Sequence, residues 1–207
     1  MACPYAHRAT LAARLCNVEL TFVTMPTTNQ FGFIDRLGIT ERSDVFGSFS
    51  KMSVEELKER KRVFKEQVNK SGEVPTLVTP SGTVIVESEI VAEYLDSISG
   101  FTLVPQDRVT AAMMRIAIKR FSQVPVAMVK LLKNQSPSDD ELLALTLDKA
   151  LSLFVESLDE GPGFCIGSSC SLADVHAAPF LFRFGIVLKH YRGICCDKLK
   201  STLYCSL

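Results

Sequence analysis

Hydrophobic residues recur with helical spacing close to the start of the chain. Four apolar positions carry this repeat: Leu11, Ala12, Leu15 and Val18. The repeat predicts a helix that begins beside Pro4, because proline is favoured in a first helical turn. The next residues, 19–24, are rich in β-branched and aromatic side chains and predict a strand. Residues 25–51 have no clear period, and we interpret them as a long loop or an insertion.

A charged amphipathic segment follows that loop. Ser53 and Glu56 have the spacing of a capping box, in which each residue's side chain pairs with the other's backbone N–H. A helix is therefore expected from this point to about Asn69.

Alternating apolar residues then predict a β-hairpin. The segments 74–79 and 83–86 flank Pro80-Ser81-Gly82, a sequence that favours a turn. Another helix should begin near Glu87-Ser88 and end before Gly100.

The second half of the chain has the pattern of helices only. A short linker at 101–105 should precede a helix from about Asp107 to Lys133. Ser136, which is followed by a proline, should cap a further helix that ends before Gly161. Ser171-Leu-Ala-Asp174 is a second capping box and should open another helix.

Together these elements predict an α/β half followed by an all-α half. The first domain is expected at residues 1–99 and the second at residues 107–207. A chain of 207 residues is long enough for two such units, each with its own hydrophobic core.

Composition narrows the possible partners. The 23 basic and 23 acidic residues balance, so neither nucleic acid nor an anionic membrane surface is expected as a partner. No segment has the 18 or more apolar residues of a membrane span. The seven cysteines occur without a secretory signal and without zinc-ligand spacing. These features predict a cytoplasmic protein with reduced thiols and no metal.

The candidate for chemistry is Cys3, in the run Cys3-Pro4-Tyr5-Ala6-His7-Arg8. A cysteine at a helix N-terminus faces unpaired N–H groups and the positive end of the helix dipole. Such cysteines can have a pKa of roughly 3.5–7.5, against about 8.5 for a free thiol, and react as thiolates. Ala6 stands where the second cysteine of a C-x-x-C motif would be, so the chemistry would need an external thiol. The alternative is an inert thiol near a frayed terminus.

Several separated motifs resemble the cytosolic glutathione transferases. Val74-Pro75-Thr-Leu, followed by the run from Glu87-Ser88 to Leu95, is similar to the glutathione-binding strand and helix of that family. Ser171-Leu-Ala-Asp174, with Pro179 five residues on, resembles the capping box of its helical domain. Cys3-Pro-Tyr-Ala and Phe121-Ser-Gln-Val-Pro125 resemble the omega-like, cysteine-dependent branch.

The resemblance implies a fold and a set of site residues. It implies a thioredoxin-like N-terminal domain, a helical C-terminal domain, glutathione as co-substrate and Cys3 as the catalytic residue. The proline after Val74 would be cis, with the backbone of Val74 paired to the cysteinyl part of glutathione. Glu87 and Ser88 would receive the amine and the carboxylate of the γ-glutamyl group. The residues expected at the glutathione site are Pro4, Tyr5, Lys61, Val74, Pro75, Glu87 and Ser88.

The resemblance also implies an activity and its alternative. The leading hypothesis is a glutathione-dependent thiol transferase or reductase that acts on a small oxidised or glutathionylated substrate through a mixed disulfide at Cys3. The alternative is a non-catalytic glutathione-transferase-like interaction module; a chloride-channel-like protein is a more remote one. A homodimer is the expectation for the family.

The individual residues have structural interpretations as well. Pro75 could be an ordinary strand-start proline, Ser88 an N-cap and Lys61 a solvated charge. The chain also departs from the family pattern, because only Met1 and Ala2 precede Cys3 where relatives have a strand. At its other end the chain stops at Leu207, before the expected final helix. We therefore expect a sheet without its first strand and a less stable fold.

Overall fold

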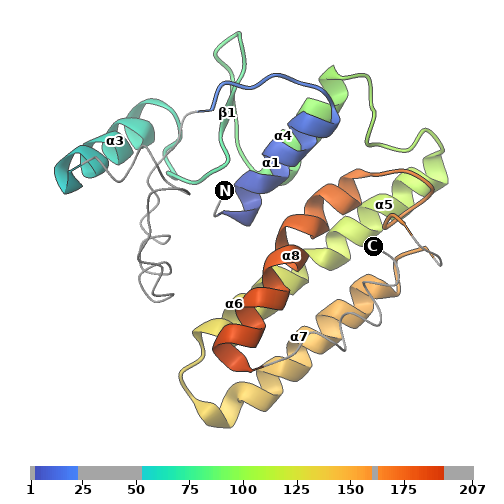
Figure 1. Ribbon diagram of the computed structural model, residues 1–207. Helices are drawn as coiled ribbons and strands as arrows, with labels where there is room; N and C mark the ends of the chain where they lie inside the picture. The colour runs from blue at the N-terminus through green and yellow to red at the C-terminus, as the bar shows by residue number, and fades with distance from the viewer. Residues whose placement is uncertain (1–2, 23–52, 160–162, 194–207) are drawn as a thin grey trace. The chain divides into compact units, whose positions relative to one another are not determined.

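A computed structural model describes residues 3–22, 53–159 and 163–193 (Figure 1). The chain divides into two units, Met1–Leu95 and Asp96–Leu207. In the described ranges, none of the helices combines the length and apolar composition that a membrane crossing needs.

The first unit opens with helix α1, Pro4–Leu15, as its apolar repeat predicts. Cys3 is its N-cap and Pro4 its first residue. One face of α1 is buried and consists mostly of small side chains, namely Ala9, Ala12 and Ala13. The exception on this face is Arg8.

The strand expected at 19–24 is wrong over the residues that the structure describes. Residues 19–22 have no strand conformation, and Glu19, Thr21 and Phe22 are exposed. β-Propensity reflects packing on a pleated surface, and within the described residues no strand lies alongside this segment. Positions 23 and 24, the expected loop at 25–51, and Met1 and Ala2 lie outside the described residues.

Helix α3, Val54–Gln67, confirms the first capping box. The Glu56 N–H donates to Ser53 Oγ at 3.2 Å, and the Ser53 N–H donates to Glu56 Oε2 at 2.6 Å. The helix ends two residues before the expected Asn69, which has a different role described below.

The hairpin is also confirmed, although its strands are short. Strand β1, Leu77–Val78, pairs antiparallel with strand β2, Val84–Ile85. Gly82 has a φ of 83°, which supplies the left-handed residue of the turn. Helix α4, Ser88–Ile98, follows directly and buries Val91, Ala92 and Leu95.

The second unit is helical throughout its described residues. Its elements are α5 (Arg108–Phe121), α6 (Gln123–Lys133), the 3-10 turn η1 (Pro137–Asp139), α7 (Asp140–Val155) and α8 (Leu172–Arg192). Helix α5 packs against α6, α7 and α8, and α8 also contacts α6, so the four helices form one bundle (Figure 1).

Four phenylalanines form the centre of that bundle. Phe121 meets Phe154 with ring centroids 4.9 Å apart and Phe180 at 6.0 Å, and Phe180 meets Phe184 at 6.0 Å. All three pairs are edge-to-face, the arrangement that the quadrupoles of aromatic rings favour. The core therefore connects α5, α7 and α8.

Two expected helix boundaries in this unit need correction. The helix predicted over Asp107–Lys133 is two helices that meet at Ser122. Pro125 lacks the N–H that would continue the α5 ladder, whereas in the first turn of α6 no such N–H is needed. The helix expected to be capped by Ser136 starts with the 3-10 turn, and the Ser136 hydroxyl lies 2.8 Å from that of Ser138 without capping the backbone.

The capping box at the start of α8 is confirmed and buried. Asp174 accepts hydrogen bonds from the Ser171 N–H, from the Ser171 hydroxyl and from the Cys165 N–H, each at 2.8 Å. One carboxylate thus fixes the start of α8 and the segment that precedes it.

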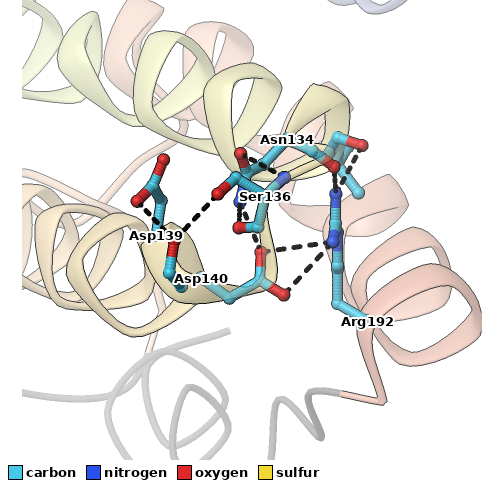
Figure 2. Close-up of polar contacts among 7 residues, drawn as sticks. Asn134, Ser136, Asp139, Asp140 and Arg192 are labelled. Carbon is cyan, nitrogen blue, oxygen red and sulfur yellow. Dashed lines mark hydrogen bonds and ion pairs between the residues drawn. The ribbon is translucent and has the colours of Figure 1, made fainter.

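The C-terminal end of α8 is fastened by Arg192 (Figure 2). Its guanidinium donates to Asp140 at 3.2 Å and to the carbonyls of Leu132 and Asn134 at the end of α6. Asp140 also accepts a hydrogen bond from the Asn134 amide at 2.7 Å. The corner between α6 and α7 and the last turn of α8 are therefore held by one cation, since carbonyls at helix C-termini attract positive charge.

Candidate functional site

Cys3 lies at the N-terminus of α1, where the sequence places it. Its backbone is extended, with φ −78° and ψ 120°, and its carbonyl accepts the His7 N–H at 3.0 Å. The thiol is free and half-buried. Because first-turn N–H groups have no intrahelical partner, the sulfur lies in the positive potential of the helix start.

Arg8 is a site residue that the sequence analysis does not identify. It is 6% exposed, and its Nη1 donates to the Ser88 hydroxyl at 3.2 Å. The guanidinium carbon lies 5.4 Å from the centroid of the Tyr5 ring, within cation–π range. One side chain therefore connects the first turns of α1 to the start of α4.

The electrostatics of this cluster follow from burial. Burial lowers the pKa of Arg8 to about 10, while Tyr5, Glu89 and Cys3 act on it in the opposite direction. Burial also raises the pKa of Tyr5; the nearby Arg8 opposes that shift and Cys3 adds to it. Arg8 thus remains a cation at neutral pH, within electrostatic reach of Cys3.

A sequence signal for Arg8 exists in the helical repeat. Arg8 shares the buried face of α1 with Ala9, Ala12 and Ala13, so it is a charged residue on a face of small side chains. A buried charge usually has a structural or functional partner. The repeat alone does not say which partner, because Ser88 lies 80 residues further along the chain.

Ser88 and Glu87 occupy the start of α4, as predicted. Ser88 is 7% exposed and begins the helix. Glu87 is exposed and has a φ of 67°, and its carbonyl accepts the Val91 N–H at 2.9 Å. The left-handed region is unfavourable for a residue with a Cβ, so the backbone of Glu87 has an uncommon conformation.

Val74 and Pro75 lie just before strand β1 of the hairpin. Leu77 pairs with Ile85 and Val78 with Val84. The Val74–Pro75 peptide bond is cis, as the resemblance implies.

A buried asparagine supports the segment that contains Val74. Asn69 is 8% exposed, and its amide donates to the Glu73 carbonyl at 3.1 Å and to Thr76 Oγ1 at 3.0 Å. Its side-chain oxygen accepts from the Ser71 N–H at 3.1 Å and from the Ser71 hydroxyl at 3.0 Å. These bonds hold the chain on both sides of Val74.

The remaining predicted site residues lie on α1 and α3. Pro4 and Tyr5 form the first turn of α1, beside Cys3 and Arg8. Lys61 is half-buried on α3 and takes no part in the hydrogen bonds described for Arg8, Ser88 and Asn69.

Known proteins with related sequences point to one family. Residues 2–98 match the model of the glutathione S-transferase N-terminal domain. Glutathione S-transferase omega-1 of Sus scrofa is 32% identical over 119 residues, which are 56% of this chain and 49% of the pig protein. The Mus musculus protein of the same name is 29% identical over 116 residues, 56% of this chain and 48% of its own length. The chain spans about half the length of the curated relatives that it matches.

Solved structures show the same fold over most of the chain. Glutathione transferase Omega 3C from Trametes versicolor has a TM-score of 0.72 at 19% identity, covering 97% of this chain and 76% of its own. A glutathione S-transferase from Methylobacillus flagellatus, solved with glutathione bound, has a TM-score of 0.66 at 18% identity. The match covers 97% of this chain and 85% of the bacterial protein's chain.

The molecule is thus a thioredoxin-like N-terminal domain followed by a helical C-terminal domain. Sequence and fold comparisons agree: residues 2–98 resemble glutathione S-transferase N-terminal domains, and omega glutathione transferases are among the relatives and solved structures to which the chain is similar.

Proposed function

We propose that this protein is a glutathione-dependent thiol transferase or reductase that acts through Cys3. The observation that carries the proposal is the Arg8–Ser88 hydrogen bond. It joins the helix start that bears the candidate nucleophile to the helix start that would hold glutathione. The omega-1 names of the curated relatives and the glutathione-bound solved neighbour support the same assignment.

In this proposal the two termini of the γ-glutamyl group meet the start of α4. The Ser88 hydroxyl takes the carboxylate and Glu87 takes the amine, since opposite charges and exposed N–H groups suit a zwitterion. The backbone of Val74 pairs with the cysteinyl part of glutathione as an added strand would. Pro4 and Tyr5 border the sulfur, Pro75 shapes the chain after Val74, and Lys61 contacts the ligand from α3.

The reaction consists of two thiol–disulfide exchanges. The anionic sulfur of Cys3 attacks the glutathione sulfur of a glutathionylated substrate; the substrate leaves as a thiolate and Cys3 is left in a mixed disulfide. A second glutathione thiolate attacks the glutathione sulfur of that disulfide, releasing oxidised glutathione and restoring Cys3. Reduction of a dehydroascorbate-type substrate would use the same cysteine and two glutathiones.

The proposal also includes the roles of the two domains, the cellular compartment and the oligomeric state. The domains at 1–99 and 107–207 would be the glutathione-binding domain and the helical C-terminal domain, respectively. A reducing compartment such as the cytoplasm suits a reaction that needs free Cys3 and reduced glutathione. Pairing into a homodimer is expected for the family.

Turnover by the full chain tests this assignment. We expect reduction of a glutathionylated peptide or of dehydroascorbate to exceed conjugation of glutathione to an aryl halide, because conjugation needs a glutathione thiolate held by a hydroxyl. Each rate should be measured with saturating glutathione and corrected for the uncatalysed reaction. Glutathione binding without turnover of any of these substrates would identify the non-catalytic module instead.

Asn69→Ala should weaken glutathione binding by releasing the segment around Val74. The substitution removes the bonds that Asn69 makes to the Glu73 carbonyl, to Thr76 and from Ser71, and we expect a loss of about 2 kcal/mol in unfolding free energy. The KM for glutathione should rise several-fold with a smaller change in kcat. Lys70→Ala is the control, because the neighbouring Lys70 side chain is exposed. Equal KM values for the two variants would contradict a role for Asn69 in presenting Val74.

A further inference from the structure

Arg8 donates a hydrogen bond to the Ser88 hydroxyl, and this bond affects what Ser88 can offer to a ligand. A guanidinium has five N–H donors and no acceptor, whereas a hydroxyl has one donor and two acceptor sites. The 3.2 Å bond from Arg8 Nη1 therefore occupies an acceptor site of Ser88 Oγ. The single hydroxyl hydrogen of Ser88 remains available to donate to a ligand.

This arrangement discriminates between the two charged ends of a γ-glutamyl group. A carboxylate accepts the Ser88 hydrogen and is attracted by the guanidinium behind it. An ammonium group can do neither, because it only donates hydrogen bonds and is repelled by Arg8. Glu87, one residue earlier and exposed, has the opposite preference.

We propose that Arg8 is a positioning residue that turns the Ser88 hydroxyl into a donor for the α-carboxylate of the γ-glutamyl group, and so sets the orientation of bound glutathione. This inference rests on the proposed function, since it assumes that glutathione binds at Ser88. Arg8 acts through Ser88 and by charge, without being the residue that reacts.

The burial of Arg8 agrees with a role in anion recognition. Burial lowers its pKa to about 10, which means that the surrounding groups do not fully offset the loss of hydration. A ligand carboxylate at Ser88 would place a further negative charge near the guanidinium and favour its charged form. If Arg8 served only to join α1 to α4, the charge of the ligand would not affect its interactions.

The test compares two ligands on the full chain by isothermal titration calorimetry. One is glutathione; the other is 4-aminobutanoyl-cysteinyl-glycine, which keeps the amine and lacks only the α-carboxylate. We expect the wild type to prefer glutathione by about tenfold or more, as a charge-assisted hydrogen bond provides. Arg8→Met should reduce this preference to near unity, mostly by weakening the binding of glutathione.

Two further variants make the result specific. Arg14→Met removes an exposed arginine from the same helix and should leave the preference at the wild-type value. Ser88→Ala should also reduce the preference, and adding Arg8→Met to Ser88→Ala should change it by less than Arg8→Met does in the wild type, because the two residues share one interaction.

Several outcomes would overturn the inference. If Arg8→Met weakens both ligands by the same factor, Arg8 is structural only. If Arg8→Met fails to fold, Arg8→Gln decides: it keeps a neutral donor, and a wild-type preference in that variant refutes the role of the charge. A wild type that binds neither ligand removes the proposed function as well, whereas an active wild type with an unchanged preference in the Arg8 variants removes only this inference.

Discussion

Cys3→Ser should abolish thiol transfer while leaving glutathione binding within about twofold of wild type. Serine cannot form the mixed disulfide, and its hydroxyl is not ionised at neutral pH. Removal of a nucleophile typically lowers kcat by several orders of magnitude, so we expect a loss on the order of 10³-fold or more. Initial rates on a glutathionylated peptide and retention on immobilised glutathione measure the two effects separately.

The matched control for Cys3→Ser is Cys170→Ser. Both residues are half-buried thiols, but Cys170 lies in the helical unit just before α8. Its replacement should leave turnover unchanged. Cys165 is a poor competitor for the chemistry, because burial raises the pKa of its thiol and the nearby Asp174 carboxylate raises it further. Turnover that survives in Cys3→Ser would place the reactive sulfur elsewhere.

Asp174→Ala should lower the unfolding free energy of the helical unit more than the substitution of an exposed N-cap residue does. The substitution leaves the N–H groups of Ser171 and Cys165 and the Ser171 hydroxyl without their acceptor. Buried donors without partners each destabilise by about 1–3 kcal/mol, so we expect a total loss of about 3–5 kcal/mol. Urea unfolding followed by far-UV circular dichroism measures this loss as a lower midpoint.

Two comparisons identify burial as the cause. Asp174→Asn keeps one oxygen acceptor and should lose clearly less than the alanine variant. Asp107→Ala removes an exposed N-cap whose carboxylate accepts the Thr110 N–H at 2.7 Å, and it should shift the midpoint much less. Similar midpoints for Asp107→Ala and Asp174→Ala would mean that Asp174 contributes only as an ordinary helix cap.

Local structure could be predicted from the sequence wherever interactions between neighbouring residues decide it. The capping boxes at Ser53 and Ser171, the turn at Gly82 and the cysteine at the start of α1 each involve residues within a few positions. The resemblance added Val74, Glu87 and Ser88; the structure has a cis peptide bond after Val74 and places Ser88 at the start of α4.

The predictions that were wrong concern elements whose structure depends on tertiary packing. The strand expected at 19–24 depends on a neighbouring strand, which the described residues do not provide. The break at Ser122 depends on how Pro125 is accommodated between α5 and α6, and the 3-10 turn before α7 forms where a capped helix was expected. In each case the residue types permit more than one local structure.

The sequence by itself determined the order of most elements, most of their caps and the position of Cys3 at a helix start, because these depend on interactions between near neighbours. Only the tertiary structure decided that Arg8 is buried and reaches Ser88 and that Asn69 braces the turn before Val74. It also shows that Glu87 has a left-handed backbone. The contact between α1 and α4 joins residues 80 positions apart, and no local pattern encodes which side chains will meet across such a distance.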